Sequence, residues 1–161
     1  MRLVIADTSP LNYLILIGCV HILPRLFDRV AIPRAVEQEL LAVDASSPVH
    51  GWISAAPAWL EIHETTGLPS VSGLDPGETA AIALAESLGA ELLLIDERAG
   101  FRIAKGRGLR VTGTLGLLDL AAERGLIDFA AAMRQLERTS FRRPEQVMQA
   151  LMAKHSKRTA P

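Results

Sequence analysis

The chain has 161 residues, of which 49% are hydrophobic and 22% are charged. This balance is typical of a single globular domain that buries roughly 70% of its unfolded surface, and it excludes a disordered chain. A formal net charge of −1 and a pI near 6.4 exclude nucleic-acid binding through overall basicity alone, without excluding a local basic surface.

Short apolar runs alternate with helical patterns along the chain. Strands are expected at residues 2–6, 29–32, 59–64, 91–95 and 109–112. Helices are expected at residues 10–24, 33–43, 48–55, 76–88, 97–107, 114–124, 128–138 and 144–155. Continuously apolar strands that alternate with helices predict an α/β protein with a parallel sheet covered on both faces. Residues 65–74 form a connection that we expect to be mobile.

The first predicted helix is apolar on nearly every side. Residues 13–17, "YLILI", are bounded by Asn12 and Gly18, well short of the roughly 20 residues of a membrane span. We therefore expect a buried helix and no membrane partner. The stretch "PLNYLILIGCVHIL" (10–23) has more apolar surface than one core contact needs, so we expect part of it to face a homodimer mate or a helix of a partner protein. Its Cys19 is the only cysteine, which excludes an internal disulfide and favours the reducing cytoplasm.

Two predicted strands end in an aspartate. "VIA" is followed by Asp7 and "LLLI" by Asp96, and the carboxyl ends of parallel strands meet at one edge of the sheet, where ligands bind. Each aspartate has an alternative role as the cap of the next helix. At Asp7 this role is already filled, because Ser9 suits the N-cap and Pro10 the first helical position. At Asp96 the alternative stays open.

Two glutamates open or border predicted helices. In "DPGETAAIALA", Asp75 and Glu78 fit a capping box, so a structural role for Glu78 stays open beside a functional one. In "PRAVEQELLAV", Glu39 borders the apolar stripe of its helix. An acid pressed against a core is costly without a partner. The partner of Glu39 is either a bound cation or a basic side chain such as Arg34 or Arg98.

Four acids share one edge if the sheet is wound as expected: Asp7, Glu39, Glu78 and Asp96. At an assumed spacing of about 5–6 Å and an effective dielectric constant of 20, each ionised pair repels by roughly 3 kcal/mol, so a cation must neutralise the set. Oxygen ligands select Mg²⁺ or Mn²⁺, and the scattered histidines make zinc a poor fit. An ion held there would activate a bound water for hydrolysis without a protein nucleophile.

Four segments in order, "IADTSPL", "IPRAVEQEL", "LDPGETAAIALA" and "LLLIDERAGFRIAKGRGL", resemble the PIN-domain nucleases. The similarity is closest to the bacterial and archaeal subgroup related to VapC toxins of toxin–antitoxin operons, and it covers residues 3–125. The tail segment "TSFRRPEQVMQALM" is similar to a helical extension of uncharacterised PIN-like proteins. We therefore expect a PIN-like nuclease domain at residues 1–125 and a C-terminal helical extension at 126–161, packed on the same domain and frayed at its end.

The resemblance implies a three-layer α/β/α sandwich whose five-stranded parallel sheet has the order 3-2-1-4-5. It implies an endoribonuclease that uses Mg²⁺ or Mn²⁺ and leaves a 5′-phosphate and a 3′-hydroxyl. The catalytic and metal-binding acids carried over by position are Asp7, Glu39, Glu78 and Asp96. Thr114 is expected in a supporting role, and Thr8 either orients a ligand carboxylate or is a simple turn residue. Many toxin relatives carry aspartate at the position of Glu78, and Glu97 offers a second carboxylate beside Asp96. RNA, a homodimer mate and an antitoxin protein are the implied partners.

A basic face follows the last of these acids. Arg98, Arg102 and Lys105 are spaced i, i+4 and i+7 on the predicted helix, so they share one side of it. We expect them to bind RNA, with a solvated face balanced by glutamates as the alternative. Aromatic residues make up only 4% of the chain, which disfavours binding by base stacking and favours recognition of a folded RNA by shape.

These observations predict a metal-dependent ribonuclease that is the toxin of a toxin–antitoxin pair. One alternative is a non-catalytic PIN-fold interaction module. The other is a phosphatase with an aspartyl nucleophile after the first strand. Such phosphatases need a second acid two residues after the first, and this chain has Ser9 at that position.

Overall fold

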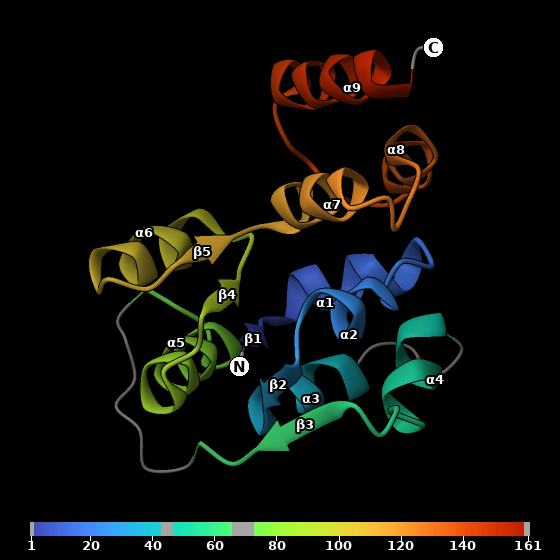
Figure 1. Ribbon diagram of the computed structural model, residues 1–161. Helices are drawn as coiled ribbons and strands as arrows, with labels where there is room; N and C mark the ends of the chain where they lie inside the picture. The colour runs from blue at the N-terminus through green and yellow to red at the C-terminus, as the bar shows by residue number, and fades with distance from the viewer. Residues whose placement is uncertain (1, 43–46, 66–72, 160–161) are drawn as a thin grey trace.

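Five parallel strands form one sheet with the order β3-β2-β1-β4-β5 (Figure 1). The computed structural model describes residues 2–42, 47–65 and 73–159. Within these ranges the strands are β1 (Leu3–Ala6), β2 (Arg29–Pro33), β3 (Leu60–His63), β4 (Leu92–Leu94) and β5 (Val111–Thr112). The strand order and the parallel pairing confirm the expected α/β fold. Most of the connection expected to be mobile (66–72) and the last two residues of the frayed end lie outside the described residues.

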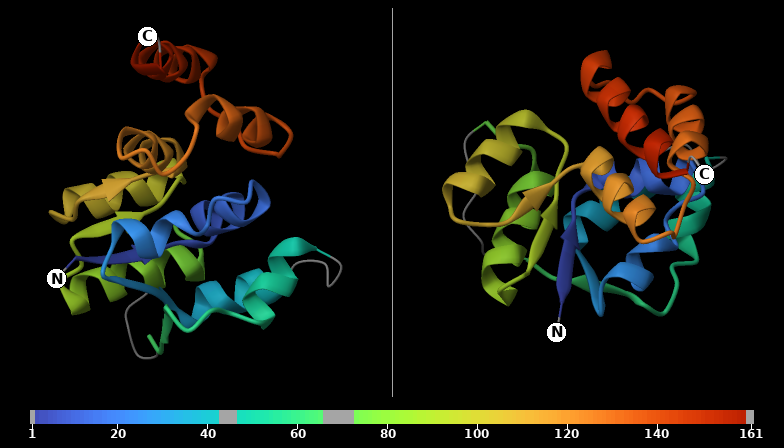
Figure 2. Two further views of the ribbon diagram at one scale, coloured as in Figure 1. Left: turned by 45° about the vertical axis from the view of Figure 1, so that its right-hand side comes forward. Right: turned by 45° about the horizontal axis from the view of Figure 1, so that its top comes forward.

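Helices cover both faces of the sheet, and the last two extend the layer that contains α7 (Figures 1 and 2). In chain order the helices of the described ranges are α1 (Thr8–Leu16), α2 (Ile22–Leu26), α3 (Arg34–Leu41), α4 (Pro48–Ser54), α5 (Pro76–Leu88), α6 (Arg98–Gly106), α7 (Thr114–Glu123), α8 (Phe129–Glu137) and α9 (Glu145–Thr159). None of these helices is both long enough and apolar enough to cross a membrane.

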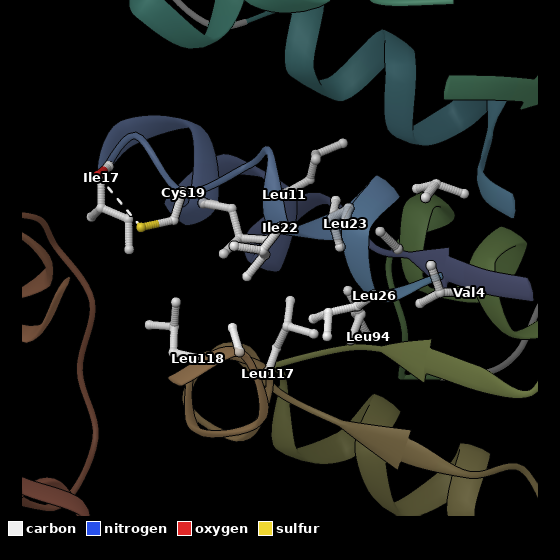
Figure 3. Packing of buried hydrophobic residues seen from close by; sticks show 14 of the residues in the cluster. Val4, Leu11, Ile17, Cys19, Ile22, Leu23, Leu26, Leu94, Leu117 and Leu118 are labelled. Atoms are coloured by element: carbon white, nitrogen blue, oxygen red, sulfur yellow. Dashed lines mark hydrogen bonds between the residues drawn. The ribbon is translucent and has the colours of Figure 1, made fainter. Parts of the chain in front are cut away.

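The two faces of β1 belong to two separate apolar cores. Leu3 and Ile5 pack with residues of α5 and α6, whereas Val4 and Ala6 pack with residues of α1, α2 and α7. Figure 3 shows the second core, in which Val4 lies near Leu26 of α2 and Leu94 of β4. This alternation is what a strand buried on both sides requires, because successive side chains point to opposite faces. It leaves the carboxyl end of β1 at the edge between the layers.

One predicted helix is two helices in the structure. The pattern at residues 10–24 is split into α1 and α2, because Gly18 takes a left-handed conformation (φ +74°) that ends the first helix and turns the chain. The expected N-cap is also wrong, since α1 already begins at Thr8 and Asp7, rather than Ser9, occupies the N-cap position. The side chain of Asp7 makes no capping hydrogen bond there, so the capping alternative does not explain this residue.

The C-terminal extension covers the apolar side of α1. The ring of Tyr13 packs edge-on against Phe141 with centroids 5.1 Å apart, and the Tyr13 hydroxyl lies 3.0 Å from Ser140 Oγ. Ile17 is only 8% exposed. Further along, His155 of α9 stacks on Phe129 of α8. Phe141 and Ser140 of the extension thus contact Tyr13, while Leu16 of the same helix is 39% exposed. The homodimer mate and the antitoxin remain predictions.

Candidate functional site

Asp7 is a buried carboxylate at the carboxyl end of the central strand. Its backbone N–H donates to the carbonyl of Leu94 on β4 (2.9 Å), which continues the sheet by one residue and holds Asp7 in place. The side chain is 4% exposed, and its Oδ1 atom is buried without a hydrogen-bond partner. Burial, opposed by a hydrogen bond from the Thr8 backbone and reinforced by the charges of Asp75 and Glu39, raises the pKa of Asp7 to about 7.

Glu78 lies in the first turn of α5 and is the second buried acid of the site. The carboxylate of Asp75 accepts a hydrogen bond from the Glu78 amide (2.8 Å) and so caps α5. The predicted cap therefore forms through Asp75. The pKa of Glu78 is raised to about 8, mainly by burial. The nearby carboxyl of Asp75 and the charges of Asp7 and Glu97 also raise it.

Glu39 is held by two donors at the edge of this cluster. The hydroxyl of Thr8 and the amide of Gly77 (3.0 Å) donate to its two carboxylate oxygens. A Cβ atom at Gly77 would lie 2.5 Å from the nearest of those oxygens, so only glycine leaves this space free. The alternative partner Arg34 is bound to Glu37 instead (2.6 Å). Glu39 is thus linked to the residue that follows Asp7 and to the start of α5.

Asp96 is bound from the C-terminal half of the chain. It accepts hydrogen bonds from the Thr114 amide (2.8 Å) and the Thr114 hydroxyl (2.6 Å), and Arg143 Nη2 lies 3.2 Å from its Oδ1. The same guanidinium donates to the Asp96 carbonyl (2.8 Å). The N-cap position of α6 belongs to Glu97 and carries no side-chain bond, so the alternative of Asp96 as the cap of α6 is excluded. A Cβ at Gly113 would lie 2.6 Å from Asp96 Oδ1.

The donor set fits a hard divalent cation. The unpaired oxygen of Asp7 and the raised pKa values of Asp7 and Glu78 mark carboxylates whose ionised forms lack compensation, and a cation would supply it. As the side chains lie, no three Asp, Glu, His or Cys residues in the described ranges form one metal-binding group. Two carboxylates with water in the other positions is a common arrangement for Mg²⁺.

A basic pocket adjoins the acids on the side of Asp96. It has a volume of about 850 Å³ and is lined, among others, by Asp96, Arg98, Phe101 and Arg102. Two of the three predicted RNA-binding residues therefore face a common cavity. The third, Lys105, is exposed on α6 but does not line the pocket.

Three features of the site could not be predicted from the sequence. Asp75 was expected only as a cap, yet its charge also acts on Asp7. The glycine of "DPGET" signals a helix start but gives no hint that Gly77 makes room for Glu39. Arg143 lies 47 residues after Asp96, and no local pattern connects the two.

Similarity to known proteins was found at two levels. The family model DUF3368, described as a PIN domain, matches residues 3–157. A PilT N-terminus domain protein from the hyperthermophilic archaeon Sulfolobus solfataricus P2 has a similar structure, with a TM-score of 0.52 and 16% identity over 72% of this chain and 90% of that chain. A domain of a functionally unknown protein from Methanocaldococcus jannaschii DSM 2661 has a TM-score of 0.46 and 16% identity, over 70% of this chain and 91% of that chain. No curated protein matches. At 16% identity, the structure from Sulfolobus solfataricus supports the fold alone.

Proposed function

Because the chain belongs to the PIN domain family, we propose that it is a metal-dependent endoribonuclease that hydrolyses phosphodiester bonds of RNA. The observation that carries this proposal is the buried carboxylate of Asp7, one oxygen of which has no hydrogen-bond partner, beside Glu78 at the carboxyl edge of the sheet. A purely structural acid at this position would have a hydrogen-bond partner, because an unpaired buried oxygen destabilises the fold. Buried carboxylates whose negative charge is not balanced by a hydrogen-bond donor or a basic side chain are instead typical of a site that binds a cation.

Asp7 and Glu78 are the residues that would hold Mg²⁺ or Mn²⁺, with Glu39 and Asp96 as the further acids of the site. A divalent ion bound there would promote the deprotonation of water and stabilise negative charge on the phosphate. Thr8 orients Glu39 and Thr114 orients Asp96 through their hydroxyl groups. These two threonines are therefore positioning residues, whose role is to keep the carboxylates at fixed places.

RNA binding is assigned to the basic side of α6. Arg98 and Arg102 line the pocket beside Asp96, and Lys105 extends the same helix face away from it. Phosphate groups need such positive charge before they can approach a set of carboxylates. We expect cleavage to leave a 5′-phosphate and a 3′-hydroxyl, as the resemblance to PIN-domain nucleases implies.

The cellular role follows from the resemblance to the VapC-related subgroup. We propose that the chain is the toxin of a toxin–antitoxin pair, acts as a homodimer in the cytoplasm and is held inactive by an antitoxin protein. Growth arrest on induced expression, absent in the Asp7→Asn variant, is the expected result. Growth unaffected by the wild-type chain at the same expression level would contradict the toxin role without touching the ribonuclease.

The ribonuclease is tested with purified protein and an end-labelled RNA of mixed sequence. Cleavage is expected with Mn²⁺ or Mg²⁺, none with EDTA, and a loss of several orders of magnitude in Asp7→Asn and Glu78→Gln. Mapping of the product ends checks for the 5′-phosphate. The same labelled sequence as DNA tests the choice of nucleic acid. Cleavage that persists in EDTA or in both variants would mean that these acids are not catalytic.

A second candidate is a non-catalytic PIN-fold module that binds RNA. It is favoured by one observation, because the carboxylate of Asp96 is already neutralised by Arg143 and hydrogen-bonded by Thr114. The module predicts RNA binding without cleavage under any metal, and without any stabilisation of the protein by Mn²⁺. The assay above therefore separates the two candidates.

A further inference from the structure

Three chain segments that are far apart in sequence enclose the pocket beside Asp96. The first runs from the end of β4 into α6 and includes Asp96 and Glu97. The second is the end of β5 with the start of α7. The third is the segment 142–147, which comprises the end of the connection after α8 and the first turn of α9. This third segment belongs to the extension and leads into α9. Its residues Arg142 and Arg143 join Arg98 and Arg102 of α6 in the lining. We call this cavity the arginine pocket.

Four arginines and two carboxylates, Asp96 and Glu97, line the arginine pocket, so its lining carries a net positive charge. Within the described part of the chain, Arg98 and Arg102 form no ion pair, and Arg142 binds only backbone carbonyls, those of Phe141 (3.0 Å) and Thr139 (3.4 Å). Only Arg143 has an acidic partner, Asp96. Four guanidinium groups around one cavity repel one another, so a polyanion that enters it lowers the electrostatic free energy.

Contacts of Phe141 and Arg143 hold the third segment in place at one side of the pocket. The guanidinium of Arg143 lies 5.2 Å from the ring centre of Phe141, and Phe141 is 6% exposed and packs against Tyr13. Arg143 also donates to the carbonyls of Arg142 (3.0 Å) and Asp96 (2.8 Å). Three of its five N–H donors are thus used. The remaining two are available to a ligand.

We propose that the arginine pocket binds the phosphate backbone of a single RNA strand next to the bond that is cut, and that the segment 142–147 supplies half of its arginines. This inference rests on the proposed ribonuclease function and adds to it a substrate subsite built in part by the C-terminal extension. Asp96 lies between the arginine pocket and the acids of the site, because it lines the pocket and its charge raises the pKa of Asp7. A strand in the pocket therefore leads directly to the acids.

The pocket has room for part of a single strand. A volume of about 850 Å³ is in the range of cavities that hold small ligands, roughly 300–1,000 Å³, so a few nucleotides fit inside it, whereas a double helix can contact only its rim. Phe101 gives the lining one aromatic side chain on which a base can stack. A single-stranded loop of a folded RNA satisfies both conditions.

The test measures RNA binding in EDTA, so that it does not depend on cleavage. Fluorescence anisotropy with a labelled single-stranded RNA of mixed sequence is recorded at several KCl concentrations for the wild type, Arg142→Ala, Arg102→Ala and Arg142→Lys. Arg134→Ala is the matched control, because Arg134 is exposed on α8 and does not line the pocket. Circular dichroism confirms that each variant is folded.

We expect Arg142→Ala and Arg102→Ala to weaken binding by about tenfold, the low end of what a lost hydrogen bond to a charged group causes. Each should also lower the slope of log K against log[KCl] by about 0.7, the value for one phosphate contact on a single strand. Arg142→Lys should keep that slope, because it keeps the charge. Arg134→Ala should bind like the wild type.

Two results overturn the subsite. One is that Arg142→Ala and Arg102→Ala bind RNA as tightly as Arg134→Ala does. The other is that the wild type does not bind the strand in EDTA at all. In either case a parallel cleavage assay with Mn²⁺ shows whether the ribonuclease itself stands, so failure of the subsite and failure of the proposed function are distinguishable.

Discussion

Thr114 donates two hydrogen bonds to the carboxylate of Asp96, one from its amide nitrogen to Oδ1 (2.8 Å) and one from its hydroxyl to Oδ2 (2.6 Å). Thr114 is the first residue of α7, so the carboxylate also faces the positive end of that helix. The acid that follows β4 is therefore positioned by the element that follows β5. Two neighbouring strands and one helix end together determine where this carboxylate lies.

Replacement of Thr114 tests that link. Thr114→Val keeps the shape and the amide but removes the hydroxyl, so a carboxylate oxygen loses its partner and the free energy of unfolding should fall by about 1–2 kcal/mol. Thr114→Ser is the control, because it keeps the hydroxyl. Urea unfolding gives the stability, and cleavage should drop strongly in the valine variant and persist in the serine variant. Equal cleavage by both would contradict the positioning role.

Asp7→Asn separates a metal ligand from a structural acid. The substitution removes a buried negative charge that Asp75 and Glu39 repel, so the metal-free protein should hold its stability or gain on the order of 1–3 kcal/mol. The rise in melting temperature on addition of Mn²⁺ should shrink, because that rise depends on binding to the native state. Thermal melts in EDTA and in Mn²⁺ measure both effects. Unchanged Mn²⁺ stabilisation with intact cleavage would show that Asp7 does not bind the ion.

Metal-free stability should depend on pH through the two buried acids. The pKa of Asp7 is raised from 3.8 to about 7 and that of Glu78 from 4.5 to about 8, so between about pH 4 and pH 8 the native state keeps protons that the unfolded chain releases. Their contribution to stability is greatest below about pH 4 and is lost as the pH rises through 7 and 8. Each group contributes a slope of at most about 1.4 kcal/mol per pH unit.

Urea unfolding in EDTA across this range, for the wild type and Asp7→Asn, checks the prediction. The variant should show a flatter profile, because one of the two groups no longer titrates. Glu61 has the opposite effect on stability, because hydrogen bonds from Arg29 and His63 lower its pKa to about 2. This effect changes with pH only below about pH 4.5, outside the range in which native Asp7 titrates. Parallel profiles for the two proteins above pH 5 would contradict a raised pKa at Asp7.

Arg143→Ala should change metal binding and RNA binding in opposite directions. Removal of a positive charge 3.2 Å from Asp96 should tighten Mn²⁺ binding by roughly twofold to fivefold, within the range for a partly exposed ion pair. RNA binding in EDTA should weaken, because the arginine pocket loses a guanidinium. Calorimetry with Mn²⁺ alone gives the first value and anisotropy the second. Weaker binding of both ligands would point to a merely structural role for Arg143.

Gly77→Ala tests the close approach of Glu39. The added Cβ would lie 2.5 Å from a carboxylate oxygen, so the Glu39 side chain must move and cleavage should fall severalfold with little loss of stability, since the end of a glutamate side chain shifts readily. Gly51→Ala is the matched control, because nothing lies within 4 Å of a Cβ added there. Cleavage unchanged in Gly77→Ala would mean that the position of Glu39 does not matter for the reaction.

The sequence alone determined the parts of this protein that short-range rules govern. Apolar runs that end in Asp7 and Asp96 predicted strands with acids at one edge, and "DPGET" predicted the helix start that Asp75 caps. These rules act over a few residues, because strand burial, capping and turn geometry depend on immediate neighbours. The break at Gly18 was missed, since a glycine inside an apolar run shows its positive φ only when the chain turns.

Only the tertiary structure decided which partners those acids have. Glu39 accepts hydrogen bonds from Thr8 and Gly77. Asp96 accepts one from the Thr114 hydroxyl and pairs with Arg143. Asp7 has one oxygen without a hydrogen-bond partner. Each pair joins residues from different elements of the chain. Such contacts depend on how strands, helices and the extension pack against one another, and a local pattern carries no information about the packing of segments that are far apart in sequence.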